Sequence, residues 1–330
     1  MNLINKEDKI FVAGHKGMVG QAIYKSLSEK GYKNLVTAER KKLDLTNEKS
    51  VNQFFYENQP DIVIIAAAKV GGIIANNTYP YEFLIENLKI QNNLISCSFD
   101  KNVNRLLFLG SSCIYPRDSK QPINEKALLT GSLEKTNESY AIAKIAGIKL
   151  CNALRKQYGF DAISLMPTNL YGPGDNYNLE NSHVIPALLR KFHEAKIKKS
   201  SYVSCWGSGT PYREFLHVND LANACIYLLE NYNVKSNLIK ELEIDDIGYL
   251  NVGTGSDISI KDLTGIVSEV VGFTGQIKWD RSKPDGTPRK RLDVTRLQKL
   301  GWSPSIDLKN GLEETYKEFK MLYNLNQIRK

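Results

Sequence analysis

Four short stretches of the chain are almost entirely apolar, and each is followed by a longer stretch with helical character. The apolar stretches lie at residues 9–13, 61–68, 105–109 and 162–166. A strand that is covered by helices on both faces has no polar side, so continuous apolar runs predict buried parallel strands. Their alternation with helices predicts an α/β fold with a doubly wound parallel sheet, whose ligands lie beyond the carboxyl ends of the strands.

The second half of the chain departs from this regular pattern. Residues 175–182 are polar and predict a first crossing into a smaller domain, whereas residues 213–220 predict a return to the sheet. Residues 249–255 predict a late strand and turn. The expected division is a nucleotide-binding domain of residues 1–174 with about 212–252, and a substrate-binding domain of about 175–211 with 253–330.

Composition excludes several classes of protein. With 330 residues, 42% hydrophobic and 24% charged, the chain is typical of a globular protein with ample core. No apolar run approaches the roughly 18–20 residues of a membrane span, and residues 1–8 lack the apolar core of a signal peptide, so we expect a cytoplasmic protein without membrane attachment. The five cysteines are scattered without Cys-x-x-Cys spacing, so neither a metal site nor a disulfide framework is predicted: Cys97, Cys113, Cys151, Cys205 and Cys225.

The net charge of +8 would suit a polyanionic partner. The basic residues, however, are not arranged with aromatic residues as in an RNA-binding motif, nor do they form a recognition helix. We therefore expect no nucleic-acid partner. A small phosphorylated ligand explains the charge equally well, and the cationic, proline-punctuated loop at residues 283–290 is well composed to close on a diphosphate.

Glycines mark the end of the first predicted strand. Gly14, Gly17 and Gly20 follow residues 9–13 directly and open a helix that continues to about residue 30. Glycine lets the backbone approach a pyrophosphate, and the N-terminus of a helix offers N–H groups and a positive dipole to it. The spacing is Gly-x-x-Gly-x-x-Gly instead of Gly-x-Gly-x-x-Gly. The sequence therefore favours a turn that binds a dinucleotide, and a tight turn without a ligand remains the alternative.

The end of the second strand, at residues 35–37, carries conflicting signals for the choice of cofactor. Glu39 is suited to accept a hydrogen bond from a ribose 2′-hydroxyl, as in NAD enzymes, whereas Arg40 with Lys16 is suited to a 2′-phosphate. We favour NADP, because several cations converge here. Asp44 follows at a place suited to contact the edge of the adenine.

Tyr140 and Lys144 stand four residues apart in a predicted helix that ends near residue 158, so their side chains share one face. A nearby ammonium favours the phenolate, so we expect it to lower the pKa of the tyrosine toward neutrality. Tyr140 would then protonate an oxygen that receives a hydride. An exposed Tyr and Lys on a surface helix remain the alternative for this pair alone.

Taken together, the glycine turn, Ser111 and the Tyr140-x-x-x-Lys144 pair resemble the extended short-chain dehydrogenase/reductase superfamily, whose members have a Rossmann fold and mostly act on nucleotide sugars. Longer strings resemble the GDP-L-fucose synthase family over nearly the whole chain: residues 15–20, 66–73, 110–116, 181–186 and 206–211. That resemblance implies a GDP-4-keto-6-deoxymannose substrate, which is epimerised at C3 and C5 and then reduced at C4 by NADPH.

The resemblance also implies roles for individual residues. Ser111, Tyr140 and Lys144 match the reductive triad, and Cys113 and His183 match the acid–base pair of epimerisation. The cofactor would contact Gly14, His15, Lys16, Gly17, Met18, Val19, Gly20, Arg40, Asp44, Leu109, Gly110, Ser111, Ser112, Lys144, Pro167, Thr168, Asn169, Leu170 and His183. The substrate would contact Ser111, Cys113, Tyr140, Asn169, Lys191, Trp206, Arg213, Asp285 and Lys290.

Two positions depart from the family pattern. Lys16 and Lys191 stand where the family commonly has arginine, and lysine lacks the planar fork that grips a phosphate. Cys205, next to Trp206, also bears on the shape of the expected pocket wall.

Two other functions remain open from the sequence. The chain could reduce C4 of a related GDP-4-keto sugar, such as a GDP-6-deoxy-4-keto-heptose, without epimerising it, since pocket contacts discriminate such sugars by only a few kcal/mol. A catalytically silent protein that senses NADP is the alternative from another class, although the intact triad disfavours it. By analogy with the superfamily we expect a homodimer, paired through helices at residues 81–101 and 136–158.

Overall fold

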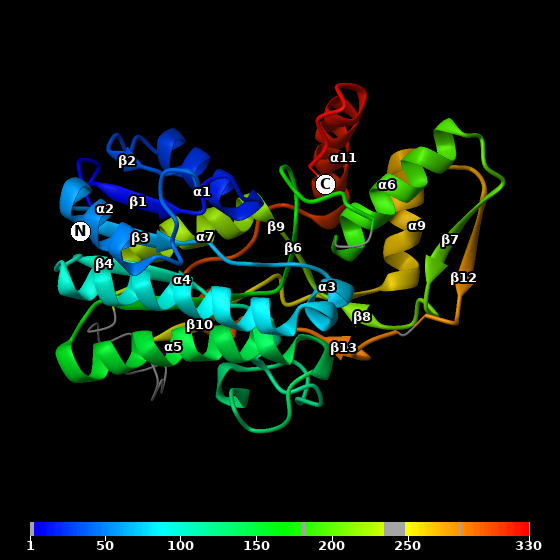
Figure 1. The fold of residues 1–330 in the computed structure, drawn as a ribbon. Coiled ribbons are helices and arrows are strands. Elements are labelled where there is room, and N and C mark those ends of the chain that lie inside the picture. The colour runs from blue at the N-terminus through cyan, green and yellow to red at the C-terminus, as the bar shows by residue number, and fades with distance from the viewer. Residues whose placement is uncertain (1–2, 180–181, 234–247, 284, 330) are drawn as a thin grey trace.

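The computed structural model describes residues 3–179, 182–233, 248–283 and 285–329 (Figure 1). Asn181 and Pro284, which belong to two of the sequence strings above, lie outside the described residues. In the part of the chain that is described, no helix combines the length and the apolar character needed to cross a membrane.

The predicted doubly wound sheet is confirmed. Its six strands are all parallel and run in the order β10-β5-β4-β3-β1-β2. Five of the six strands are buried along their whole length, as their apolar sequences require. The strands are β1 (Ile10–Ala13), β2 (Leu35–Val36), β3 (Ile62–Ile65), β4 (Arg105–Leu109), β5 (Ala162–Pro167) and β10 (Tyr249–Val252).

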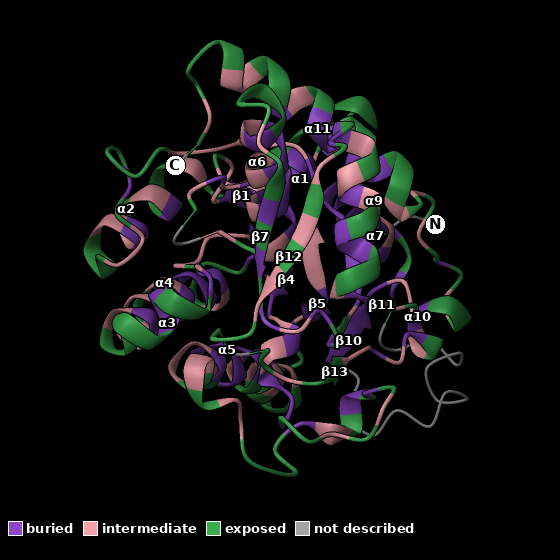
Figure 2. Cartoon of the chain, turned by 90° about the vertical axis from the view of Figure 1, so that its right-hand side faces the viewer, coloured by how far each residue is buried: buried purple, intermediate pink, exposed green. Residues whose placement is uncertain are grey.

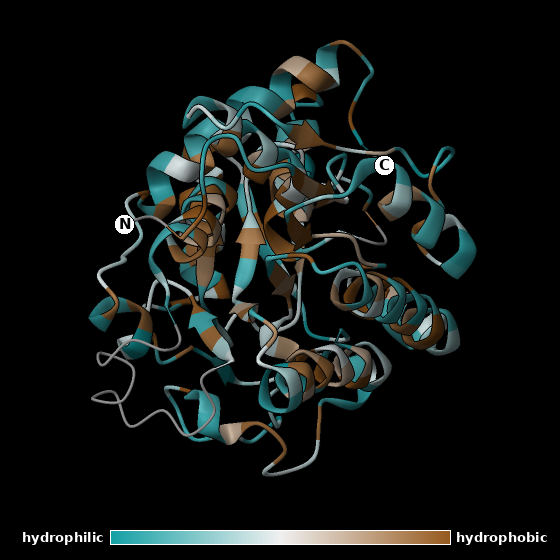
Figure 3. Cartoon of the chain, turned by 90° about the vertical axis from the view of Figure 1, so that its left-hand side faces the viewer, coloured by the Kyte–Doolittle hydropathy of each residue, from teal (hydrophilic) through white to brown (hydrophobic). Residues whose placement is uncertain are grey.

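Helices cover both faces of this sheet (Figures 1 and 3). One hydrophobic cluster packs α1 (Met18–Glu29) and α7 (Val218–Asn231) against the strands. A second cluster packs α2 (Glu48–Asn58), α4 (Pro80–Asp100) and α5 (Glu138–Tyr158) against the opposite face. In Figure 3 brown, hydrophobic stretches are seen along strands in the interior, whereas the outer sides of the helices are largely hydrophilic in colour. The sheet is therefore sandwiched as the sequence pattern predicts.

A third hydrophobic cluster lies apart from the sheet (Figure 1, right) and joins α6 (Val184–Ile197), α9 (Ile260–Val271) and α11 (Leu308–Asn324). Beside it, β7 (Tyr202–Trp206) pairs in parallel with β12 (Gln276–Asp280), and β7 alternates exposed and buried residues (Figure 2). Leu297 and Trp302 instead pack in a cluster that flanks the sheet. The predicted domain boundaries stay a prediction.

Residues 213–217, predicted to return to the sheet, do not join it as strands, whereas α7, which begins at Val218, does pack against it. β8 (Tyr212–Arg213) pairs with β11 (Ile258–Ser259) and β13 (Arg289–Lys290), and β9 (Phe215–His217) pairs with β6 (Asn169–Tyr171). The place beside β5 is taken by β10. The remaining short elements are α3 (Ile73–Thr78), α10 (Thr295–Lys299), η1 (Ser112–Ile114), η2 (Glu125–Ala127) and η3 (Lys135–Asn137).

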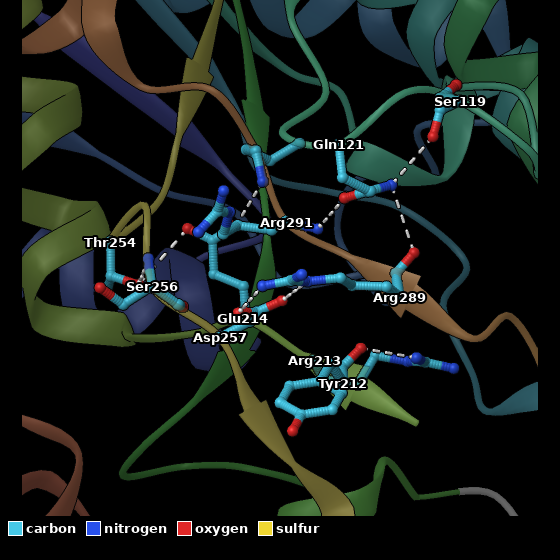
Figure 4. Close-up of polar contacts among 11 residues, drawn as sticks. Ser119, Gln121, Tyr212, Arg213, Glu214, Thr254, Ser256, Asp257, Arg289 and Arg291 are labelled. Atoms are coloured by element: carbon cyan, nitrogen blue, oxygen red, sulfur yellow. Dashed lines mark hydrogen bonds and ion pairs between the residues drawn. The ribbon is translucent and has the colours of Figure 1, made fainter. Parts of the chain in front are cut away.

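Glu214, between β8 and β9, is fully buried and joins segments from distant parts of the chain (Figure 4). Its Oε1 accepts a hydrogen bond from Gly255 N and its Oε2 from Leu292 N, both at 2.7 Å. Its backbone oxygen accepts from Thr168 Oγ1 at 3.2 Å and from Asn169 Nδ2 at 2.8 Å. Burial raises the pKa of this carboxyl. The end of β5, the turn after β10 and the segment after β13 therefore meet at one side chain.

We expect Glu214→Gln to lower the free energy of unfolding by about 1–3 kcal/mol, because one backbone N–H would then face an amide NH₂ instead of an oxygen. Urea unfolding followed by circular dichroism measures the change. Glu313→Gln, at an exposed position of α11, is the control and should stay within about 0.5 kcal/mol of the wild type. Equal midpoints for the two variants would contradict this account of Glu214.

Candidate active site

The glycine turn after β1 leaves no room for side chains at two of its glycines. Gly14 has φ +90°, and a Cβ there would lie 2.7 Å from Ala67 Cα. A Cβ at Gly20 would lie 2.1 Å from Gly14 O. Gly17 is the N-cap of α1, and no side chain caps the helix. The turn thus presents the first N–H groups of α1, including those of Met18 and Val19, without a side-chain cap, which suits a pyrophosphate.

Glu39 and Lys16, the residues suited to the 2′-hydroxyl of NAD and to the 2′-phosphate of NADP respectively, lie in contact with each other. Lys16 Nζ forms an ion pair with Glu39 Oε1 at 2.7 Å, and this pairing lowers the pKa of Glu39. Arg40 Nη2 lies 3.9 Å from Glu86 Oε2, and most of the arginine side chain is exposed. Asp44, the predicted adenine contact, accepts from Thr46 N at 2.9 Å and from Thr46 Oγ1 at 2.7 Å, which lowers its pKa. Two cations and three carboxylates therefore share this edge of the fold.

Lys144 is buried on α5, with 3% of its surface exposed. Its Nζ donates a hydrogen bond to Leu109 O, at the end of β4, over 2.8 Å, and lies 4.8 Å from the centroid of the Phe108 ring. Burial lowers the pKa of the ammonium to about 7. This contact ties α5 to the carboxyl end of β4, where the fold predicts a ligand.

Tyr140 lies on the same helix, and its ring centroid is 5.9 Å from Lys144 Nζ. Burial raises the pKa of the phenol, and a hydrogen bond with the Ser111 side chain offsets this only in part. The expectation that Lys144 lowers the pKa of Tyr140 is therefore wrong for the chain alone. The physical reason is that desolvation acts on both groups and favours the neutral form of each.

Ser111 and Cys113 lie in the turn that follows β4. Ser111 caps η1, where its Oγ accepts from Cys113 N at 3.2 Å. Cys113 is partly exposed, whereas the other four cysteines are buried. Asn137 Nδ2 donates to Cys113 Sγ over 3.4 Å. The structure thus brings Ser111, Cys113 and Tyr140 together, and it adds Asn137, which the sequence argument missed.

The end of β5 lies beside the end of β4, because Gly110 N donates to Leu165 O at 2.8 Å. Pro167 is the last residue of β5, and Thr168 is buried behind it. Asn169 and Leu170, in β6, are only partly buried. The predicted cofactor residues at 109–112 and 167–170 therefore line adjacent strand ends.

His183 is the N-cap of α6, and its side chain does not cap the helix. The residue retains exposed surface, yet the protein around it lowers the pKa of the imidazole by desolvation. Among the described residues, no hydrogen bond joins His183 to Cys113 or Tyr140. The structure leaves its predicted pairing with Cys113 as a prediction.

The predicted substrate residues on the smaller side of the molecule form two groups. Lys191 Nζ lies 4.9 Å from the centroid of the Trp206 ring, and burial lowers the pKa of this lysine. Asp285 accepts from Ser208 N at 2.6 Å through Oδ1 and from Ser208 Oγ at 2.8 Å through Oδ2. Ser208, which the sequence argument missed, thus anchors the loop that carries Asp285.

Arg213 interacts both with Asp285 and with the turn after β4 that carries Ser111 and Cys113, called the reactive turn below. Burial lowers the pKa of its guanidinium, and the charges of Asp285, Cys113 and Glu134 act in the opposite direction. Lys290 in β13 is the register partner of Arg213 in β8. The neighbouring Arg289 holds β13 by donating to both carboxylate oxygens of Asp257, at 2.5 and 2.9 Å (Figure 4).

The chain is similar to several known proteins. Residues 10–239 match the NAD dependent epimerase/dehydratase family. The chain is 54% identical to GDP-L-fucose synthase 1 of Arabidopsis thaliana, over 96% of this chain and 94% of that protein.

Two solved structures have the same fold. A GDP-6-OMe-4-keto-L-xylo-heptose reductase from C. jejuni superposes with a TM-score of 0.90 at 37% identity, covering 96% of this chain and 99% of that one. A GDP-L-fucose synthetase from Naegleria fowleri bound to NADP gives a TM-score of 0.86 at 26% identity, covering 98% and 97%. The chain therefore belongs to the NAD dependent epimerase/dehydratase family and, within it, to the group that contains the GDP-L-fucose synthases.

Proposed function

We propose that this protein epimerises a GDP-4-keto-6-deoxy sugar at C3 and C5 and reduces it at C4 with NADPH. The observation that carries the proposal is the convergence of Ser111, Cys113 and Tyr140 at the end of β4. One turn there offers hydroxyl donors for a keto oxygen and a thiol for proton transfer. The 54% identity to a GDP-L-fucose synthase supports the choice of substrate.

The residues present fit NADPH. The uncapped N-terminus of α1 and the close-packed glycines suit the pyrophosphate, and Lys16 with Arg40 suits the 2′-phosphate. NADPH, when bound, supplies the hydride for C4. Lys144, held at Leu109 O, stands where its ammonium can interact with the ligand and with Tyr140.

We expect the protein in the cytoplasm, and cell fractionation that recovers it elsewhere would contradict this.

Reduction at C4 needs donors already in place for the developing alkoxide. Ser111 Oγ accepts from Cys113 N, and its own O–H would donate to the C4 oxygen of the bound sugar. Tyr140 donates a second hydrogen bond and then gives its proton to that oxygen as the hydride reaches the carbon. An ordinary phenol keeps its proton at neutral pH, and burial raises the pKa of Tyr140 further.

Epimerisation needs a base and an acid on opposite faces of the sugar. A carbon next to the C4 ketone loses its proton to the Cys113 thiolate, and the electron pair moves to the C4 oxygen. A proton from His183 on the other face then re-forms the C–H bond and inverts the centre. Imidazole and thiolate are chemically suited to these roles.

The GDP portion would lie against the smaller side of the molecule. Arg213 presents a planar fork for the diphosphate, and Lys290 in the adjacent strand adds a second cation. Trp206, 47% exposed beside Lys191, offers an aromatic face for a ring of the ligand. Asp285 and Asn169 supply further hydrogen-bonding groups near the same site.

A second candidate function is reduction at C4 without epimerisation. The observation in its favour is the likeness to the C. jejuni heptose reductase, at 37% identity and a TM-score of 0.90. Uptake of deuterium from D₂O at C3 and C5, followed by NMR without NADPH, separates the two candidates. A wild-type protein that oxidises NADPH with the sugar but incorporates no deuterium would overturn epimerisation and favour the reductase.

Tyr140→Phe removes the proton donor and keeps the ring. We expect the rate of NADPH oxidation with the keto sugar to fall by roughly 10²- to 10⁴-fold. Deuterium uptake at C3 and C5 should persist, because Ser111 still donates to the C4 oxygen. Loss of both activities to the same extent would show that Tyr140 serves more than the reduction.

Cys113→Ser should have the opposite effect, because a hydroxyl is far too weak an acid to supply the base. We expect deuterium uptake to be abolished while slow reduction of the unepimerised ketone persists. Cys225→Ser, at a fully buried site on α7, is the control for a general effect of losing a thiol. Normal deuterium uptake in Cys113→Ser would exclude Cys113 as the base.

We further propose a homodimer in which α4 and α5 of two protomers form a four-helix bundle. The two helices pack side by side on the outside of the molecule (Figure 1) and expose Tyr81, Ile142 and Tyr158, at 71%, 44% and 58%. Burial of such side chains would stabilise the pairing. Light scattering at micromolar concentration should give the mass of two chains, and a monomer would contradict the proposal.

A further inference from the structure

Asn137 stands at the N-cap of α5, yet its side chain does not cap the helix. Asparagine is favoured at this position because its side-chain oxygen usually accepts from a backbone N–H of the first turn. Asn47 at the start of α2 does this, accepting from Ser50 N at 3.0 Å. The side chain of Asn137 therefore serves something other than the helix.

That side chain is turned toward the reactive turn instead. Its Nδ2 donates to Cys113 Sγ over 3.4 Å, whereas its Oδ1 is buried and makes no hydrogen bond to any described residue. A buried amide oxygen without a partner costs free energy. The stability of α5 would be better served by a capping side chain, so this placement is not explained by folding alone.

The backbone holds Asn137 in this position. Asn137 N donates to Glu134 O at 3.1 Å in the turn before α5. The Glu134 carboxylate in turn accepts from Thr287 Oγ1 at 3.3 Å and lies 3.5 Å from Arg117 Nε. The segment that carries the Asn137 amide is therefore held by Glu134, which contacts both Thr287 and Arg117.

We infer that Asn137 is a positioning residue for Cys113: its amide N–H holds the sulfur and favours the thiolate over the thiol. The inference rests on the proposed function, in which Cys113 is the base of epimerisation. An N–H donated to a thiolate is a hydrogen bond to a charged acceptor, which is stronger than the same bond to a thiol. A thiolate, not a thiol, removes a proton.

Other groups around Cys113 also bear on its charge. Tyr140 on α5 and Arg213 on β8 both interact electrostatically with the thiol. Arg213 in turn interacts with Asp285 and Glu134. Lys144 lies one helical turn beyond Tyr140. None of these groups changes in the variants used below, so a difference between the variants reports on the amide.

The rate of alkylation by iodoacetamide tests this inference without any sugar. Cys113 is the one cysteine of the five that is not buried, so alkylation of the folded protein reports on it. Asn137→Ala removes the donor, and Asn137→Asp also places a carboxylate beside the sulfur while it restores a good capping residue. We expect alkylation at pH 7 to slow about tenfold or more in both variants.

The pH dependence separates stabilisation of the thiolate from simple access to the sulfur. At pH 9.5 the two variants should match or exceed the wild-type rate, because a less stabilised thiolate is the better nucleophile. Thermal unfolding should show Asn137→Asp to be as stable as the wild type. Asn47→Ala, the matched control, should lose stability and keep the wild-type alkylation rate.

An unchanged alkylation rate at pH 7 in Asn137→Asp would overturn the inference, and so would equal slowing at both pH values. The result is independent of the proposed reaction. Failure of the wild type to exchange deuterium at C3 and C5 would overturn epimerisation, whereas the alkylation profile alone decides whether Asn137 acts on Cys113.

Discussion

The buried carboxylate of Glu214 is the contact on which the arrangement of the two sides of the molecule depends. It accepts backbone hydrogen bonds from the turn after β10 and from the segment after β13, while its own backbone oxygen accepts hydrogen bonds from the side chains that follow β5. A carboxylate without exposed surface is tolerated only when such donors satisfy it. Arg213, which is proposed to bind the diphosphate, directly precedes Glu214. The contacts of Glu214 therefore position Arg213 relative to the predicted cofactor residues that follow β5.

Desolvation, more than the proximity of charges, determines the acid–base properties of the site. It raises the pKa of Tyr140 and lowers that of Lys144 to about 7 from 10.5. Between pH 7 and pH 10.5, the folded chain binds fewer protons at Lys144 than the unfolded chain does. The contribution of this group to stability therefore rises with pH across that window and is lost as the pH falls through 7. A site that disfavours an unpaired ammonium in this way is stabilised by ligands that bring negative charge to it.

Much of the fold follows from local patterns in the sequence. Continuous apolar runs mark β1, β3, β4 and β5, and the spacing of Tyr140 and Lys144 places both on one face of a helix. Deviations occur where distant segments meet. The short strands around Arg213 pair outside the main sheet, with partners that lie up to 77 residues away in the sequence, and no local pattern encodes that register.

The same limit applies to the candidate site. Ser208 supports Asp285 across 77 residues, and Asn137 reaches Cys113 across 24. Neither contact has a motif of its own. Asn137 lies directly before the helix that carries Tyr140, and the sequence alone does not show that its side chain turns away from that helix. The expected lowering of the Tyr140 pKa failed for a related reason: sequence spacing gives proximity to Lys144 but not the burial of both groups.

One set of hydrogen-bond donors can serve both halves of the proposed reaction. Removal of a proton next to the ketone and addition of hydride to it both place negative charge on the same atom, the C4 oxygen. Ser111 and Tyr140 therefore need to be positioned only once. Because Cys113 N donates to Ser111 Oγ, the residue that would take the proton also orients a hydroxyl that stabilises the resulting charge. This coupling places the base and the oxygen donors on a single turn after β4, where a displacement of the turn affects both reactions together.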